Sequence, residues 1–231
     1  MSDARSTILG KISRSLGVET DDPARRQTVT DRLSTRKRGT VPLRATGAPS
    51  ELVKRFIGYA KAVAATVDRL DDTDKIPDAI AAYLKKENLP AAFRMAPHED
   101  LRGIDWPAHP ALTVTEGPSD GHDLVGVNRA VCGVAETGTL VMTSGPETPT
   151  TLNFLPETEV IVVRADEIVG GYEDAWDVVR QRADVAGEMP RTVNMITGPS
   201  RTGDIEQTIY LGAHGPRRLH ILIIGDEKKQ G

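Results

Sequence analysis

The sequence is poor in cysteine, because Cys132 is the only one in 231 residues. A single thiol cannot close a disulfide within the chain, which is typical of proteins from a reducing compartment. It also cannot hold an iron–sulfur cluster or a cysteine-rich zinc site by itself. We therefore expect this chain to bind no such cofactor.

Long apolar runs are missing as well. No stretch approaches the roughly 18 apolar residues of a membrane-spanning helix. The opening "MSDARSTILGKISRSLG" carries an acidic residue early and has no long apolar segment, unlike a secretory signal. We therefore expect a cytoplasmic protein without a membrane span. The net charge of −4 gives no reason to expect the whole chain to bind nucleic acid.

Three common cofactor motifs are also absent. No G-x-G-x-x-G follows an expected strand, which argues against a dinucleotide site. The five histidines lack the H-E-x-x-H spacing, so we expect no metal site. The spacing from Gly198 to Gly203 imitates the start of a P-loop, but Asp204 stands where that motif needs lysine. ATP binding of the P-loop type is therefore not expected.

The N-terminal residues 1–49 are expected to lie outside the folded body. Ile8, Ile12 and Leu16 recur every four positions, which predicts a short amphipathic helix. The following residues are polar and charged, which predicts a flexible arm. Within it, "RLSTRKRG" is basic, and we favour a solvated tail over a nucleic-acid contact because no aromatic residues accompany it.

Residues 50–231 form the expected body, in which helical patterns alternate with short apolar runs. The predicted helices span residues 50–64, 76–89, 172–184 and 203–211. The predicted strands span residues 65–69, 91–96, 111–117, 159–165, 191–197 and 217–225, and 133–145 is expected to be rich in strand around a glycine turn. This alternation predicts an α/β fold with a mostly parallel sheet.

The stretch "ITGPSRTGDIE" from Ile196 to Glu206 has the pattern of a strand followed by a turn and a helix. Ligands bind at such places in open parallel sheets. Gly198 would let the backbone approach a ligand, and Arg201 would add a forked donor. The other polar residues of the turn and of the expected first helical turn are Ser200, Thr202, Asp204 and Glu206. A simple helix cap is the alternative, since Asp204 and Glu206 would repel a phosphate there.

A second candidate turn is "AETGT", in which Glu136 precedes Thr137, Gly138 and Thr139. A glutamate buried beside a strand has a raised pKa and can serve as a base or a nucleophile. The alternative is a glutamate that only satisfies backbone donors in a tight turn.

A third glycine-containing loop, "TSGPETPT", places Ser144 beside Gly-Pro just past a strand. We expect Glu136, Thr137, Ser200 and Asp204 to meet in one pocket at the carboxyl edge of the sheet.

Three segments carry a resemblance to a known family: "AETGTLVMTSGP", "PETEVIVVRADEIV" and "ITGPSRTGDIEQTIYLGAHGPRRLHILIIG". Over about residues 50–225 the chain resembles the LUD-domain family, in its lactate utilisation protein C (YkgG-like) branch. The resemblance implies a three-layer α/β fold akin to the NagB/RpiA/CoA-transferase superfamily. Gly203 is a departure, because alanine is more usual at that position of the family motif.

The resemblance also implies a function. The chain would be a component or accessory subunit of an iron–sulfur-dependent system that oxidises L-lactate to pyruvate. A Cys-rich protein and an iron–sulfur protein would be its partners and carry the clusters, and a small organic anion would be its ligand. Glu136 is the nearest analogue of the acyl nucleophile of CoA-transferases, so a free-standing acyl- or CoA-transferase, or a sugar-phosphate isomerase, is the alternative.

Overall fold

The computed structural model describes residues 2–19, 22–203, 209–212 and 214–225. The chain divides into two compact units, residues 1–40 and 41–231. The first unit holds α1 (Ser2–Leu16) and α2 (Pro23–Thr35). Helix α1 was predicted, whereas α2 lies in a segment predicted to be an arm without regular structure. Asp22 explains α2, because its Oδ1 accepts from the N–H groups of Ala24 and Arg25 at 2.9 and 3.3 Å and caps the helix.

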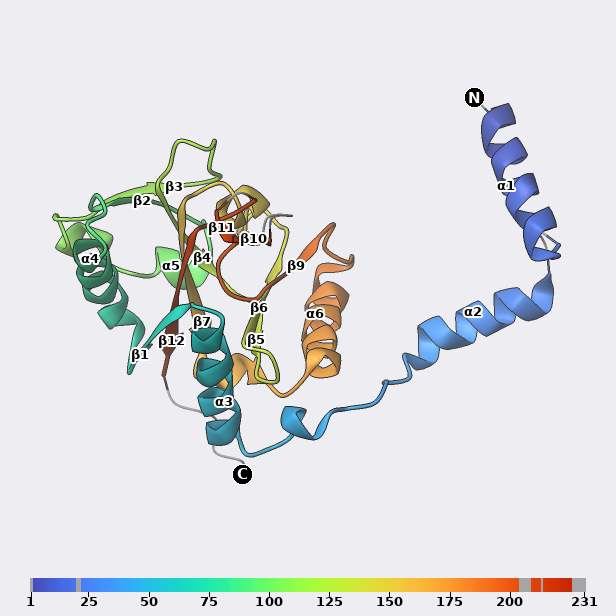
Figure 1. Cartoon of the computed structure of the whole chain (residues 1–231), viewed down its shortest axis with the longest axis horizontal. Coiled ribbons are helices and arrows are strands. Elements are labelled where there is room, and N and C mark those ends of the chain that lie inside the picture. The colour runs from blue at the N-terminus through green and yellow to red at the C-terminus, as the bar shows by residue number, and fades with distance from the viewer. Residues whose placement is uncertain (1, 20–21, 204–208, 213, 226–231) are drawn as a thin grey trace. The chain divides into compact units, whose positions relative to one another are not determined.

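The second unit is built on a six-stranded sheet in the order β1-β12-β7-β4-β2-β3, and all of its strand pairs are parallel (Figure 1). Its strands are β1 (Thr66–Leu70), β2 (Ala92–Met95), β3 (Thr113–Glu116), β4 (Val125–Arg129), β7 (Thr158–Arg164) and β12 (Arg218–Ile224). A four-stranded sheet in the order β8-β5-β6-β9 lies beside it. Its strands are β5 (Cys132–Val134), β6 (Thr139–Thr143), β8 (Ile168–Val169) and β9 (Val193–Ile196).

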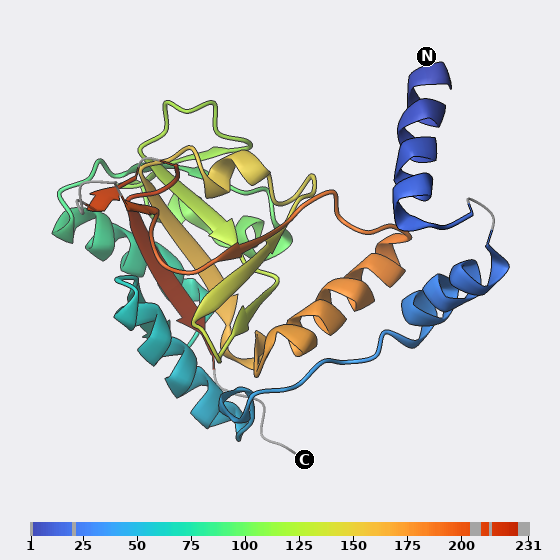
Figure 2. The same ribbon diagram turned by 45° about the vertical axis from the view of Figure 1, so that its right-hand side comes forward.

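Helices cover these sheets in layers (Figure 2). They are α3 (Pro49–Ala62), α4 (Ile76–Lys86), α5 (Glu99–Arg102) and α6 (Tyr172–Ala186). Short 3-10 turns add η1 (Leu43–Ala45), η2 (Thr73–Lys75), η3 (Trp106–Ala108), η4 (Thr150–Asn153) and η5 (Ala165–Glu167). No helix within the described ranges is both long and apolar enough to cross a membrane.

Strand β7 shows how the core is divided. Val160 and Val162 contribute to one cluster with Ile80 of α4, whereas the alternate residues of β7 face a second cluster around Phe56 of α3. A third cluster packs Val179 of α6 against the four-stranded sheet. The predicted layered α/β fold with a mostly parallel sheet is therefore confirmed.

The predicted helix over residues 203–211 is wrong. Arg201–Gly203 forms β10, which pairs antiparallel with β11 (Ile209–Leu211), while residues 204–208 lie outside the described residues. Ile209 and Tyr210 are β-branched and aromatic, and such residues favour strand over helix. Consequently, Thr202 and Gly203 lie in a strand, and the helix predicted to begin at Gly203 does not begin there.

Candidate functional site

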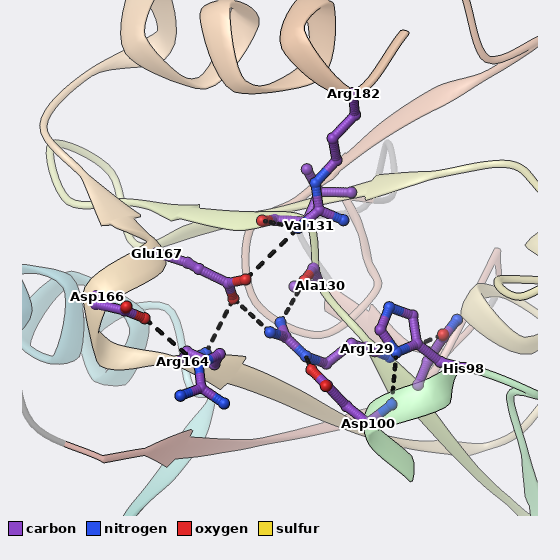
Figure 3. Close-up of polar contacts among 10 residues, drawn as sticks. His98, Asp100, Arg129, Ala130, Val131, Arg164, Asp166, Glu167 and Arg182 are labelled. Carbon is purple, nitrogen blue, oxygen red and sulfur yellow. Dashed lines mark hydrogen bonds and ion pairs between the residues drawn. The ribbon is translucent and has the colours of Figure 1, made fainter. Parts of the chain in front are cut away.

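The carboxyl ends of three neighbouring parallel strands bring charged side chains together (Figure 3). Strand β4 ends at Arg129, and the chain leaving β2 leads to His98 and Asp100. Strand β7 ends at Arg164 and continues into η5, which contains Glu167. This edge is where open α/β sheets bind their ligands.

Arg129 lies at the centre of this cluster and is only 3% exposed. Its Nε donates to Asp100 at 2.8 Å and its Nη2 to Glu167 at 2.6 Å. Its Nη1 donates to the carbonyl oxygen of Ala130. Burial alone would raise the pKa of Asp100, but the hydrogen bond and charge of Arg129 outweigh it and lower that pKa. Asp100 therefore stays ionised, and Asp100 and Glu167 together fix the guanidinium at the strand end.

His98 lies beside this cluster as a neutral ring. Burial, followed by the nearby charge of Arg129, lowers the pKa of His98 below its usual value. Its Nδ1 accepts from the N–H of Asp100 at 3.2 Å. The single proton of the neutral ring therefore sits on Nε2, which makes His98 a hydrogen-bond donor through that atom.

A cavity of about 400 Å³ opens at this edge, and we call it the carboxyl-edge cavity. Its polar lining includes His98, Arg129, Ser144, Glu147, Thr148 and Arg182. Arg182 reaches it from α6, with its side chain 47% exposed and its Nη2 lying 3.4 Å from the carbonyl oxygen of Val131. A cavity of about 450 Å³ adjoins it and shares Ser144 and Arg182. Arginine, imidazole and hydroxyl donors in one cavity suit an organic anion.

Glu136, by contrast, is enclosed by the fold. The residue is 5% exposed, and its Oε1 accepts from the N–H of Tyr172 at 3.2 Å. Its Oε2 lies 3.6 Å from Nε of Arg44. Both carboxylate oxygens are thus engaged by the first turn of α6 and by η1.

The two glycine-bearing turns do lie side by side. The Oγ1 atoms of Thr139 and Thr197 are 2.7 Å apart, as are those of Thr139 and Thr137. The hydroxyl of Tyr172 lies 3.0 Å from both Thr137 and Thr139. The hydroxyl groups at this point bind one another and join the turn after β5 to the turn after β9.

Gly138 and Gly198 are needed here for packing. Both have positive φ, at 69° and 73°. A Cβ on Gly138 would clash with the backbone of Ala60, and one on Gly198 would lie 2.6 Å from the carbonyl oxygen of Val63. Both glycine-bearing turns therefore pack closely against the C-terminal end of α3. Arg201 also donates a hydrogen bond to the carbonyl oxygen of Val63, at 2.9 Å.

Ser144 and Ser200 lie at opposite ends of the β6–β9 pair. Thr143 pairs with Val193 at the end near Ser144, whereas Leu140 pairs with Ile196 at the end near Ser200. Ser200 lines a separate cavity together with Gly198 and Arg201, and the wall of that cavity does not include Glu136 or Thr137.

Among the remaining residues of the 198–206 motif, Thr202 belongs to β10, and Asp204 and Glu206 lie outside the described residues.

Sequence reasoning missed the side chains at the carboxyl edge. Arg129 follows "LVGVN" and His98 follows "FRMAP", so an arginine or histidine at the end of a short, largely apolar run was an available signal. Glu159, which lines the cavity of Ser200, was treated only as part of a strand. Among the described residues, no group of three or more His, Cys, Asp or Glu side chains is placed to hold a metal ion.

Comparison with known proteins finds a family model that matches part of the chain. Residues 122–224 match the model of the LUD domain. An uncharacterized protein of Neisseria meningitidis is 40% identical over 99 residues, which cover 43% of this chain and 41% of that protein. Lactate utilization protein C of Bacillus subtilis is 32% identical over 102 residues, 44% of this chain and 42% of its own. Protein YkgG of Escherichia coli, uncharacterized, is 29% identical and covers 72% of this chain and 71% of its own.

These matches are partial, and the chain spans about half the length of most of the curated relatives it matches. Among solved structures, a DUF162 family protein from Deinococcus radiodurans superimposes with a TM-score of 0.55. The two proteins are 21% identical, and the aligned region covers 78% of this chain and 100% of the Deinococcus protein. At that identity the likeness concerns the fold alone.

Proposed function

We propose, from the match of residues 122–224 to the LUD domain model, that the chain belongs to this family and takes part in lactate utilisation. Its role is that of a component or accessory subunit of a system that oxidises L-lactate to pyruvate. The observation that carries the proposal is the similarity to proteins named lactate utilization protein C, of which that of Bacillus subtilis is 32% identical over the shared segment.

The carboxyl-edge cavity supplies the chemistry that such a role requires. L-lactate and pyruvate both carry a carboxylate with an oxygen on the adjacent carbon. Arg182 binds the carboxylate through its guanidinium group. Ser144, whose Oγ accepts from the N–H of Thr192 at 2.9 Å, keeps its O–H free to donate to the ligand. The Nε2–H of His98 donates to the adjacent hydroxyl or keto oxygen, which sets the orientation of the ligand.

The two electrons of lactate oxidation leave through partner chains in this proposal. Cys132 is fully buried, and burial raises the pKa of its thiol to about 12. A buried thiol of this kind stays protonated and inert. A Cys-rich protein and an iron–sulfur protein supply the clusters that accept the electrons, while this chain holds the organic acid.

Growth on L-lactate tests the proposal. Deletion of the gene abolishes growth on L-lactate but not on glucose, and the wild-type chain restores it. Arg182→Gln does not restore growth, because the carboxylate loses its forked donor. Arg180→Gln is the matched control on the same helix, since Arg180 pairs with Asp177 and is not among the residues that line the cavity. Normal growth of the deletion strain would contradict the proposal.

The alternative of a free-standing acyl- or CoA-transferase that uses Glu136 has less support. A nucleophilic carboxylate needs an open approach for the acyl donor. Glu136 is 5% exposed, and its oxygens face the Tyr172 N–H and Arg44. Glu136→Gln is therefore expected to complement growth on L-lactate, and a covalent acyl adduct on Glu136 would favour the transferase instead.

A further inference from the structure

Glu159 is a buried carboxyl group that the proposed function does not use. It lies on β7 with 0% exposure, and neither of its carboxyl oxygens has a hydrogen-bond partner. Its partners across the sheet are Gly126, which has no side chain, and Leu219. Burial raises the pKa of Glu159 well above its usual value, which favours the protonated carboxyl group and its O–H donor.

Asn153 presents a second unpartnered donor in the same region. The Oδ1 of Asn128 accepts from the N–H of Arg129 at 2.8 Å, so the Nδ2 of Asn128 is directed to Asn153. That Nδ2 donates to Oδ1 of Asn153 at 2.7 Å. The amide orientation of Asn153 is thereby fixed. Its Nδ2 is buried and has no hydrogen-bond partner.

The side chains of Glu159 and Asn153 line one cavity of about 270 Å³, which we call the Glu159 cavity. Ser200 and Arg201 of the glycine-bearing turn after β9 also line it. The Oγ of Ser200 accepts from the N–H of His214 at 3.4 Å, which leaves its O–H able to donate. Phe154 and Met195 contribute apolar wall. Glu159 lies near the start of β7, at the other end of that strand from Arg164 and the carboxyl edge.

We propose that the Glu159 cavity is a second ligand site, separate from the carboxyl-edge cavity, and that it binds a short aliphatic monocarboxylate. The O–H of Glu159 and the N–H of Asn153 donate to the carboxylate oxygens, and the charge of Arg201 offsets that of the ligand. The aliphatic chain contacts Phe154 and Met195. The site explains why two buried polar groups are left without partners in the protein, since such groups are costly unless something bonds them.

The chemical class follows from the donors. A protonated Glu159 does not repel an anion, and among the described residues no other carboxyl group lines the cavity. Within that described lining, a cation would meet one arginine and several donors. The small volume limits the ligand to a few carbon atoms. The Glu159 cavity would bind such a ligand whatever the role of the chain in lactate utilisation.

Calorimetric titration of the full chain with butyrate tests this site. Wild type is expected to bind one butyrate there. Glu159→Gln keeps both a donor and an acceptor, so its affinity stays within about threefold, whereas Glu159→Leu lowers it by about tenfold or more. Asn153→Leu, a second variant, acts like Glu159→Leu. Replacing the unpartnered carboxyl of Glu159 by an apolar group of similar size preserves the fold. Asn153→Leu also leaves Nδ2 of Asn128 without its acceptor, so thermal unfolding checks that both variants remain folded.

The controls separate this site from the carboxyl-edge cavity. Arg182→Gln is expected to leave butyrate binding unchanged, and butyramide is expected to bind at least about tenfold more weakly because it lacks the charge. The proposal is overturned if butyrate does not bind, if Glu159→Leu binds as wild type does, or if butyramide binds equally well. It is also overturned if a crystal soaked in butyrate shows only water between Glu159 and Asn153.

Discussion

At the scale of single residues, the Arg129 cluster ties three strand ends together through ion pairs. Because Arg129 is 3% exposed, its replacement leaves Asp100 and Glu167 without their central partner. Breaking a buried ion pair costs about 3–5 kcal/mol. Since both carboxylates are partly exposed, we expect Arg129→Leu to lower the free energy of unfolding by about 3 kcal/mol. Urea denaturation measures it.

The matched control for this cluster is the exposed pair of Arg102 and Glu116. Solvent screens such a pair, so Arg102→Gln is expected to leave the urea midpoint unchanged. Equal losses in the two variants would show that Arg129 is an ordinary surface charge.

His220 predicts a loss of stability in acid. Its ring stacks on Tyr83 at 4.0 Å, and its Nδ1 lies 2.8 Å from Oγ1 of Thr66. Burial lowers the pKa of His220 to about 4, from 6.5. Between these two pH values the unfolded chain binds a proton that the folded chain does not. The stability contributed by the neutral ring is therefore present above pH 6.5 and is lost as the pH falls to 4.

We expect this loss to be on the order of 3 kcal/mol at most. Urea midpoints measured from pH 7 to pH 4 for wild type and for His220→Gln test it, because the variant lacks the titrating ring. The variant should show a shallower decline. Parallel curves for the two proteins would exclude His220 as the cause.

The pH dependence that Glu159 contributes to stability is opposite in sign to that of His220. The pKa of this carboxyl is raised in the folded state, so the folded chain keeps a proton that the unfolded chain loses above about pH 4.5. Stability therefore falls as the pH rises above that value. Glu159→Gln removes this proton, and we expect it to unfold at a higher temperature than wild type at pH 8. A lower melting temperature would mean that the carboxylate form is stabilised in the fold.

At the scale of elements, the end of α3 organises both glycine-bearing turns. Gly198 has a φ of 73°, and a Cβ added to it would clash with Val63. Gly187 has a similar φ of 80°, and a Cβ added to it would lie in open space. Alanine at either position costs about 1 kcal/mol for the backbone alone. We expect Gly198→Ala to cost about 2 kcal/mol more than Gly187→Ala, because it also displaces α3. Chemical denaturation compares the two, and equal costs would contradict the packing role.

Most elements could be predicted because their apolar periodicity is strong. Helices α3, α4 and α6 and strands β7 and β12 show clear patterns and lie where the sequence predicts them. Strand β4 was missed, since its residues Val125–Arg129 are all buried and include glycine and asparagine rather than an alternating pattern. The β10–β11 pair was mistaken for a helix because acidic residues beside a glycine imitate a helix start.

At the scale of the whole molecule, the site was harder to predict than the fold. The sequence drew attention to glycine-bearing turns, but their contacts depend on distant segments. Of the predicted residues, Ser144 lines the carboxyl-edge cavity, whereas Ser200 and Arg201 line the Glu159 cavity. Arg129 and His98 meet only because parallel strands end at one edge, and register between distant strands is not encoded in local spacing.

The boundary of the folded body gives another prediction. The compact unit begins at residue 41, ahead of the expected 50. Ala45 is buried, its carbonyl oxygen leaves no room for a side chain on Gly170, and Arg44 lies near Glu136. We expect a chain that starts at residue 41 to keep the unfolding temperature of the full protein, whereas one that starts at residue 50 melts earlier. Equal melting temperatures for the two truncations would contradict this.

In the proposed function, the carboxyl-edge cavity holds a small hydroxy or keto acid. Calorimetric titration of the wild-type chain, Arg182→Gln and Arg180→Gln with L-lactate and with pyruvate tests whether it does. We expect wild type and Arg180→Gln to bind alike, and Arg182→Gln to bind at least about tenfold more weakly. Equal affinity in all three chains, or no binding by wild type, would contradict the claim.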